Sequence, residues 1–149
     1  MSIRRSLITA IVTAIVVTIS GRASAAQMDK QLKKLPAAVQ AAVKEQTKGA
    51  TLVGVSEEKA DGKAVYEVET KVNGRTRDLL IDRAGTVIEV EEEVTLEMLP
   101  AAVQSALSAR GKVLKVETLT KGSTVTYEAQ VEKNGKKSEV VVDATGKVR

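Results

Sequence analysis

Hydrophobic and polar positions follow a helical period from residue 35, and the same period returns from residue 99. Pro36 and Pro100 suit the first position of a helix, and Gly49 and Gly111 suit the residues that follow its end. Each predicted helix has one apolar face, so it has to cover another element. The apolar positions are Leu35, Val39, Ala42 and Val43 in the first helix, and Leu99, Val103, Ala106 and Leu107 in the second.

The segments after each helix change to an alternation of apolar and polar residues, which is typical of strands with one buried face. Asn73-Gly74 and Asn134-Gly135 supply the positive φ angles of two-residue hairpin turns. A further strand is expected from Thr86 to about Val90. The residues predicted to face the helices are Val53, Val55, Tyr66, Val68, Leu79 and Ile81, and then Leu114, Val116, Tyr127, Ala129, Val140 and Val142.

The register of both hairpins follows from their turns, because a two-residue turn pairs its flanking residues and the pairing then steps outward. Apolar residues meet on one face without adjustment, which supports this register independently of the turn chemistry. Both tyrosines of the chain are therefore expected in the core beneath the helices. The predicted pairs are Tyr66 with Ile81, Val68 with Leu79, Tyr127 with Val142, and Ala129 with Val140.

The two halves of the chain repeat one another. The sequence LPAAVQ at residues 35–40 recurs unchanged at residues 99–104, and turn and core residues further on recur at an offset of 61. Duplication of one supersecondary unit explains matches at turn and apolar positions together. The predicted fold class is α+β, with two tandem α-β-β-β(-β) repeats at residues 26–94 (the first unit) and 95–149 (the second unit). We expect an antiparallel sheet with one helix per repeat packed on one face.

These motifs resemble those of the PepSY-like, β-lactamase-inhibitor-like family of exported bacterial proteins. The resemblance covers nearly all of the chain after residue 26 and implies tandem α-β repeats. It also implies a non-catalytic, protein-binding or inhibitory role outside the cytoplasm, and it brings no catalytic residues. The matching motifs are Tyr66-x-Val68, Asn73-Gly74, Leu79-x-Ile81-Asp82-x-x-Gly85-x-Val87, Tyr127, Gly135, Val140-x-Val142-Asp143 and Gly146-x-Val148.

Residues 1–25 have the pattern of a secretory signal peptide. Arg4-Arg5 precedes the apolar run Leu7–Ile19, and Ala23-Ser24-Ala25 matches a small-x-small cleavage site. The apolar run has thirteen residues, whereas a spanning helix needs about 20. We expect cleavage near Ala25/Ala26, no stable membrane insertion afterwards, and a periplasmic or secreted protein.

The amino-acid composition excludes several kinds of catalytic and binding site. The chain contains no Cys and no His, which excludes thiolate or imidazole metal sites and His-based triads. Without Arg4, Arg5 and Arg22 of the signal segment, 20 basic residues remain against 19 acidic residues, and only two residues are aromatic, both Tyr. A nucleic-acid partner is therefore not expected. We predict no enzyme activity and no cofactor.

Carboxylates are the remaining candidates for chemistry. In the predicted register Glu69 faces Asp78, and Glu67 lies two residues along the same face. The chain has no calcium loop of EF-hand spacing, and the second unit places Gln130 opposite Glu139 instead. A solvated face is the ordinary interpretation of the three acids. A small cation-binding protein, or an enzyme that uses these carboxylates, is the alternative function.

A dense acidic run lies after the first unit's last predicted strand. We interpret it as a solvated connector to the second helix, with an acidic docking patch for a basic partner as the alternative. The run comprises Glu89, Glu91, Glu92 and Glu93.

The last strand of the second unit is the candidate partner-binding segment. After it, the sequence has only Lys147, Val148 and Arg149 where the first unit has a further strand. A strand edge without a full neighbour can accept an added strand from a protein or peptide. Alternatively, the other unit covers the edge, or Lys136, Lys137 and Lys147 protect it. The predicted function is an exported, non-catalytic protein-binding or inhibitory module, with its candidate contacts at Glu139, Val140, Val141 and Val142.

Overall fold

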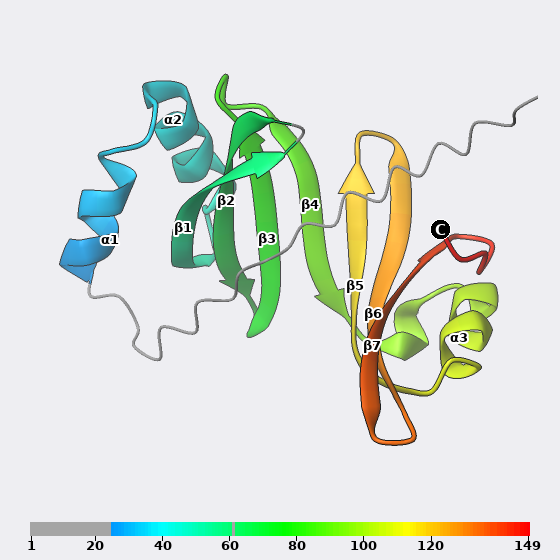
Figure 1. Ribbon diagram of the computed structural model, residues 1–149. Coiled ribbons are helices and arrows are strands. Elements are labelled where there is room, and N and C mark those ends of the chain that lie inside the picture. Colours follow the sequence, from blue (N-terminus) through cyan, green and yellow to red (C-terminus); the bar gives the residue numbers. More distant parts are fainter. Residues whose placement is uncertain (1–24, 61) are drawn as a thin grey trace, which may run out of the picture.

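The computed structural model describes residues 25–60 and 62–149, and within them it is an α+β protein (Figure 1). The signal peptide expected at residues 1–25 lies outside the described residues, except for Ala25. The helices are α1 (Ala25–Leu32), α2 (Ala37–Gln46), the short 3₁₀ helix η1 (Leu96–Met98) and α3 (Ala101–Ser108). The strands are β1 (Thr51–Ala60), β2 (Lys63–Val72), β3 (Arg75–Asp82), β4 (Val87–Val94), β5 (Lys112–Lys121), β6 (Thr124–Lys133) and β7 (Lys136–Asp143).

The seven strands form one antiparallel sheet in which spatial order equals sequence order. The predicted fold class is confirmed. Strand β4 is longer than expected, since it continues to Val94 and pairs with β3 on one side and with β5 on the other. The two units therefore share a single sheet.

The β2–β3 and β6–β7 hairpins have the predicted turns and the predicted registers. Asn73 and Gly74 have φ angles of 52° and 84°, and Asn134 and Gly135 have φ angles of 53° and 74°. These are the left-handed values that a type I′ turn requires. All four predicted pairs are present: Tyr66 with Ile81, Val68 with Leu79, Tyr127 with Val142, and Ala129 with Val140.

The first strand of each unit departs from the prediction because each contains a β-bulge. The register shifts between Leu52 and Gly54 in β1, and between Val113 and Lys115 in β5. A bulge adds one residue and reverses which side chains face the core on one side of it. Leu52 and Val113 therefore pack against the core, and the prediction that Val53 and Leu114 face it was wrong.

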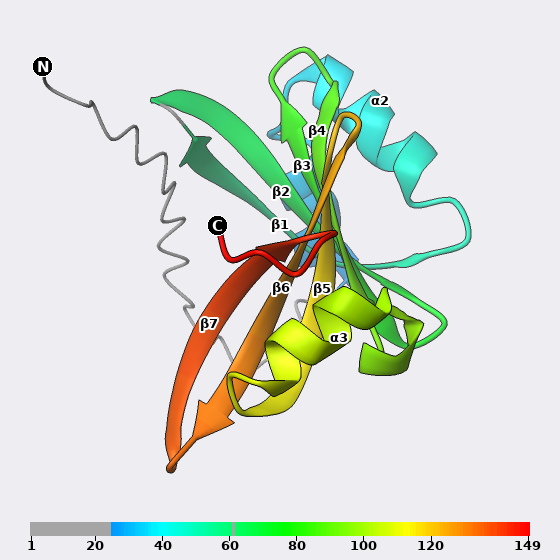
Figure 2. The ribbon, with the colours of Figure 1, turned by 90° about the vertical axis from the view of Figure 1, so that its right-hand side faces the viewer.

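Helices α2 and α3 lie on the same side of the twisted sheet (Figure 2). A hydrophobic cluster lies beneath each of them. Val90 and Val94 of β4 lie four residues apart, hence on one face, and they pack against the first and second cluster respectively. The tyrosines are buried as predicted, with exposed fractions of 3% for Tyr66 and 9% for Tyr127. The buried members are Val39, Val43, Tyr66, Val68, Leu79 and Ile81, and then Leu99, Val103, Leu107, Val116, Tyr127, Ala129, Val131 and Val142.

The repeated LPAAVQ sequence adopts the same local structure twice. The Nε2 of Gln40 donates to the carbonyl of Leu35 at 2.9 Å, and Gln104 donates to Leu99 at 2.8 Å. Pro36 and Pro100 are the N-cap residues, so each helix begins one residue later than expected, at Ala37 and Ala101. Helix α1, which the pattern did not predict, precedes the first repeat. The boundary assigned between the units at residues 94 and 95 stays a prediction.

Candidate functional site

The sheet face opposite the helices carries most of the acidic residues of the strands. Directly paired residues point to the same side of a sheet, and side chains alternate along each strand, so the registers assign this face. None of the described helices packs on it (Figure 2). We call the following set the acidic face: Glu67, Glu69, Asp78, Glu89, Glu91, Glu93, Glu117, Glu128 and Glu139.

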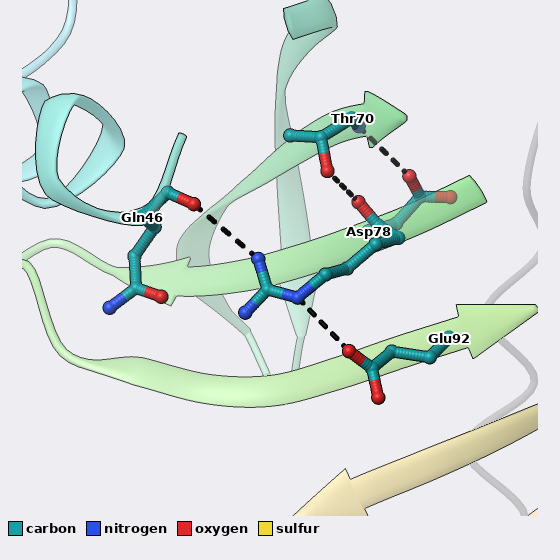
Figure 3. Close-up of polar contacts among 5 residues, drawn as sticks. Gln46, Thr70, Asp78 and Glu92 are labelled. Atoms are coloured by element: carbon teal, nitrogen blue, oxygen red, sulfur yellow. Dashed lines mark hydrogen bonds and ion pairs between the residues drawn. The ribbon is translucent and has the colours of Figure 1, made fainter. Parts of the chain in front are cut away.

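The three carboxylates singled out from the sequence lie on this face. Glu69 is directly opposite Asp78, as predicted, and Glu67 lies two residues along β2. The backbone N–H of Thr70 donates to Oδ1 of Asp78 at 3.2 Å, while the Thr70 hydroxyl donates to the carbonyl of Arg77 (Figure 3). Within residues 25–60 and 62–149, no group of three or more acidic side chains is arranged to hold a metal ion. The geometry therefore does not favour the cation site.

Glu67 is held in an environment that favours its protonated form. Burial is the largest cause, followed by a hydrogen bond and charge repulsion from Glu58, and together these and the Glu69 and Asp78 charges raise the pKa of Glu67 to about 7. The Ser56 hydroxyl also donates to Oε2 of Glu67 at 3.3 Å. Glu67 thus shares a proton-binding site with Glu58 of β1.

Glu91 lies at the middle of the acidic face, on the strand that joins the units. Burial and then repulsion from Glu89, Glu117, Glu128 and Asp78 raise the pKa of Glu91 to about 7. These neighbours come from β3, β4, β5 and β6. The acidic face therefore takes up protons in the neutral pH range.

Burial also raises the pKa of Asp78 and the pKa of Glu128. Repulsion from Glu69 and Glu117 adds to the effect at Asp78, which the Thr70 N–H opposes. Repulsion from Glu139 and Glu117 further raises the pKa of Glu128. Like charges on adjacent strands destabilise a sheet, so the fold tolerates this arrangement at a cost.

The acidic run is not a solvated connector, and this prediction was wrong. Glu89 is only 6% exposed and forms an ion pair with Lys121 of β5 at 2.9 Å. Hydrogen bonds from the N–H and hydroxyl of Thr76, at 3.2 and 3.0 Å, hold the pKa of Glu93 below its usual value. The run was misread because sequence alone gave no sign that β4 pairs with β5.

One member of the run, Glu92, points to the helix side. Its Oε1 accepts from Nε of Arg77 at 3.1 Å, and Nη1 of Arg77 donates to the carbonyl of Gln46 at the end of α2 at 3.5 Å (Figure 3). This arginine links the C-terminal end of α2 to β4. The alternation of the run thus places Glu92 in a structural contact and the other three on the acidic face.

The sequence pattern did not indicate Glu117 and Glu128 as members of the acidic face. Both lie in strands that the pattern predicted, but they are close to Glu91 only because β4 pairs with β5. Lys115 forms an ion pair with Glu117 at 2.6 Å and partly offsets the negative charge there. A long-range pairing of this kind has no local sequence signal.

The predicted partner-binding strand β7 lies at one edge of the sheet, and its edge is partly covered. The carbonyl of Val141 accepts from the N–H of Arg149 at 3.0 Å, and the N–H of Asp143 donates to the carbonyl of Lys147 at 2.9 Å. Val142 and Val148 form a single β-bridge. Within the described residues, the backbone edge from Lys136 to Glu139 has no paired strand.

None of the described helices is long and apolar enough to cross a membrane. This finding applies to residues 25–60 and 62–149.

Residues 36–91 match the family described as "Peptidase propeptide and YPEB domain", PepSY. No curated protein matches the chain in sequence. The fold is α+β, and the part of it that is similar to the PepSY family, residues 36–91, lies in the first unit. The predicted resemblance to PepSY-like proteins is confirmed over residues 36–91.

Solved structures from Bacteroides share the fold. A protein of Bacteroides eggerthii described as periplasmic has a TM-score of 0.63 at 22% identity, over 76% of this chain and 85% of that one. A BLIP-like protein of Bacteroides fragilis has a TM-score of 0.56 at 23% identity, over 75% and 81%. A DUF2874 family protein of Bacteroides ovatus has a TM-score of 0.60 at 20% identity, over 76% and 84%. At these identities the likeness establishes the fold alone.

Proposed function

We propose that this protein is an exported, non-catalytic module that binds a protein partner through the acidic face, in the manner of an inhibitor-like domain. The observation that carries the proposal is a broad sheet face that the described helices leave uncovered and that gathers carboxylates from β2 to β7. The BLIP-like and periplasmic descriptions of the structural neighbours support an inhibitor-like role outside the cytoplasm.

The chemistry of the face indicates a partner with lysine or arginine at its surface. A cationic partner stabilises the charged form of Glu91 and Glu67, both of which have pKa values of about 7 in the free protein. Binding therefore releases protons near pH 7 and strengthens as the pH rises from 6 to 8. Added salt weakens it, because the attraction between exposed charges is screened.

The test is affinity capture from an envelope extract, with a pair of variants that change net charge equally. Glu69→Lys reverses an exposed charge on the acidic face, while Glu57→Lys reverses an exposed charge on the helix side of β1. We expect the captured partner to be lost with Glu69→Lys and retained with Glu57→Lys. Equal capture by both variants, or catalytic turnover by the purified protein, contradicts the proposal.

A further inference from the structure

The free part of the β7 edge is a second interaction surface, which offers backbone groups where the acidic face offers carboxylates. In an antiparallel pair, the N–H and C=O of one residue point to the same neighbour, and the direction alternates along the strand. The Val141 carbonyl points away from β6, since it accepts from Arg149. The backbone groups of Glu139 and Lys137 therefore also point away from β6, because the β6–β7 register has no shift.

The first unit shows what fits beside such an edge. Strands β3 and β7 correspond at an offset of 61, so Lys137, Glu139 and Val140 occupy the places of Thr76, Asp78 and Leu79. Beside β3 lies β4, which places Val90 opposite Leu79. The Val142–Val148 bridge repeats the Ile81–Val87 pair at the same offset, so it marks the start of an equivalent position beside β7.

The side chains along the edge add charge and apolar complementarity. Val140 is partly buried and packs against the second cluster, so it extends the core to the edge of the sheet. Lys136 and Lys137 are exposed. At the place of Lys137 in the first unit, Thr76 contacts the carboxylate of Glu93 through both its N–H and its hydroxyl. An acidic residue at the corresponding position of an added strand would meet the Lys137 ammonium group.

We propose that the β7 edge binds an extended protein segment as an eighth strand, antiparallel to β7, with an apolar residue opposite Val140 and an acidic residue opposite Lys137. The pairing region is Lys137 to Val141, which shifts the segment expected from the sequence toward the hairpin turn. A longer strand replaces the single-residue bridge at Val148. The edge pairs through backbone groups and the acidic face binds through carboxylates, and only Glu139 belongs to both, so either interaction can fail while the other holds.

The probe is a synthetic peptide with the sequence of residues 86–94, in which Glu91→Thr removes the carboxylate that would face Glu139. In the β4 register, its Val90 lies opposite Val140 and its Glu93 opposite Lys137. We expect binding to the purified protein in a titration followed by NMR. New amide protection should appear at Lys137 and Glu139. An absence of binding, or protection confined to β1 or the helices, overturns the proposal.

Charge exchange separates strand addition from non-specific attraction. Lys137→Glu in the protein should lower the affinity for the peptide about threefold to fivefold. A peptide that also carries Glu93→Lys should recover that affinity. Glu139→Pro removes an outward N–H and should weaken binding about tenfold, whereas Glu139→Gln keeps the N–H and should not. Spectra of the free variants check that the β6–β7 pair is intact. Equal affinity across these variants contradicts an added strand.

Discussion

The tyrosines are the largest side chains in the two cores, and each closes its cluster beneath a helix. Tyr66→Ala and Tyr127→Ala should each destabilise the protein by about 3–5 kcal/mol, because truncating a buried aromatic residue leaves a cavity. Thermal denaturation followed by circular dichroism measures the effect. Val125→Ala, at a position on β6 that is 38% exposed, is the control and should change the melting temperature little. A melting temperature unaffected by the tyrosine variants would falsify the core assignment.

Glu91 has a pKa of about 7, which exceeds the ordinary value of 4.5. Between these two values the folded state binds more protons than the unfolded state, so stability falls as the pH rises through this window. The loss is complete above about pH 7 because both states are then ionised. Glu91→Gln should raise the stability at pH 8, by about 1 kcal/mol after allowance for solvent screening.

The same variant should have little benefit at pH 5, where the folded protein already carries Glu91 in its neutral form. Urea denaturation at pH 5 and pH 8 measures the difference. Glu57→Gln, at an exposed position on the other face, is the matched control. A Glu91→Gln stabilisation that is equal at both pH values would show that charge repulsion is not its cause.

At the scale of elements, the turn after β3 is fitted tightly against α2. Gly85 has a φ angle of +85°, and a Cβ atom placed there would lie 2.6 Å from the carbonyl oxygen of Ala38. Gly74 has a nearly equal φ angle of +84°, yet a Cβ atom there would meet nothing within 4 Å. Alanine at either position is therefore strained in its backbone, but only alanine at position 85 also overlaps a neighbouring atom.

Gly74→Ala should lower the free energy of unfolding by about 1 kcal/mol through backbone strain alone. Gly85→Ala should cost clearly more, because the helix backbone has to shift as well. Comparing the two melting temperatures measures the contribution of helix–turn packing. Equal losses would mean that α2 moves freely relative to the turn.

The elements that the sequence predicts well are those with local signals. The Asn-Gly turns determined the registers of β2–β3 and β6–β7, and the apolar spacing predicted α2 and α3. The bulges at Val53 and Leu114 had no such signal, because apolar residues also occupy the preceding positions, Leu52 and Val113. Either choice buries a large aliphatic side chain, and only packing against the neighbouring strand decides between them.

The acidic face was only partly predictable for a related reason. Glu67, Glu69 and Asp78 belong to one hairpin, so the predicted register of that hairpin already placed them on one face. Glu91 and Glu117 come from different units, and their proximity depends on the pairing of β4 with β5. The expected connector is therefore the central strand of the sheet.

At the scale of the whole molecule, β4 couples two cores that have separate helices. Its residues Val90 to Val94 pair with Thr120 to Val116 of β5, and its apolar side chains contact both clusters. If one unit unfolded alone, β4 would lose either its neighbour on one side or part of its packing. The sheet therefore favours unfolding of both units together.

This coupling predicts that a core mutation in the second unit destabilises the first. Leu107→Ala removes a side chain of α3 that has no exposed surface, and it should cost about 2–5 kcal/mol. Hydrogen exchange should show the same loss of protection at Val68 and Leu79 of the first unit as at Ala129 and Val131 of the second. Ser105→Ala, at an exposed position of the same helix, should leave all four amides unchanged. Loss of protection limited to the second unit would instead mean that the β4–β5 pairing opens before the first core unfolds.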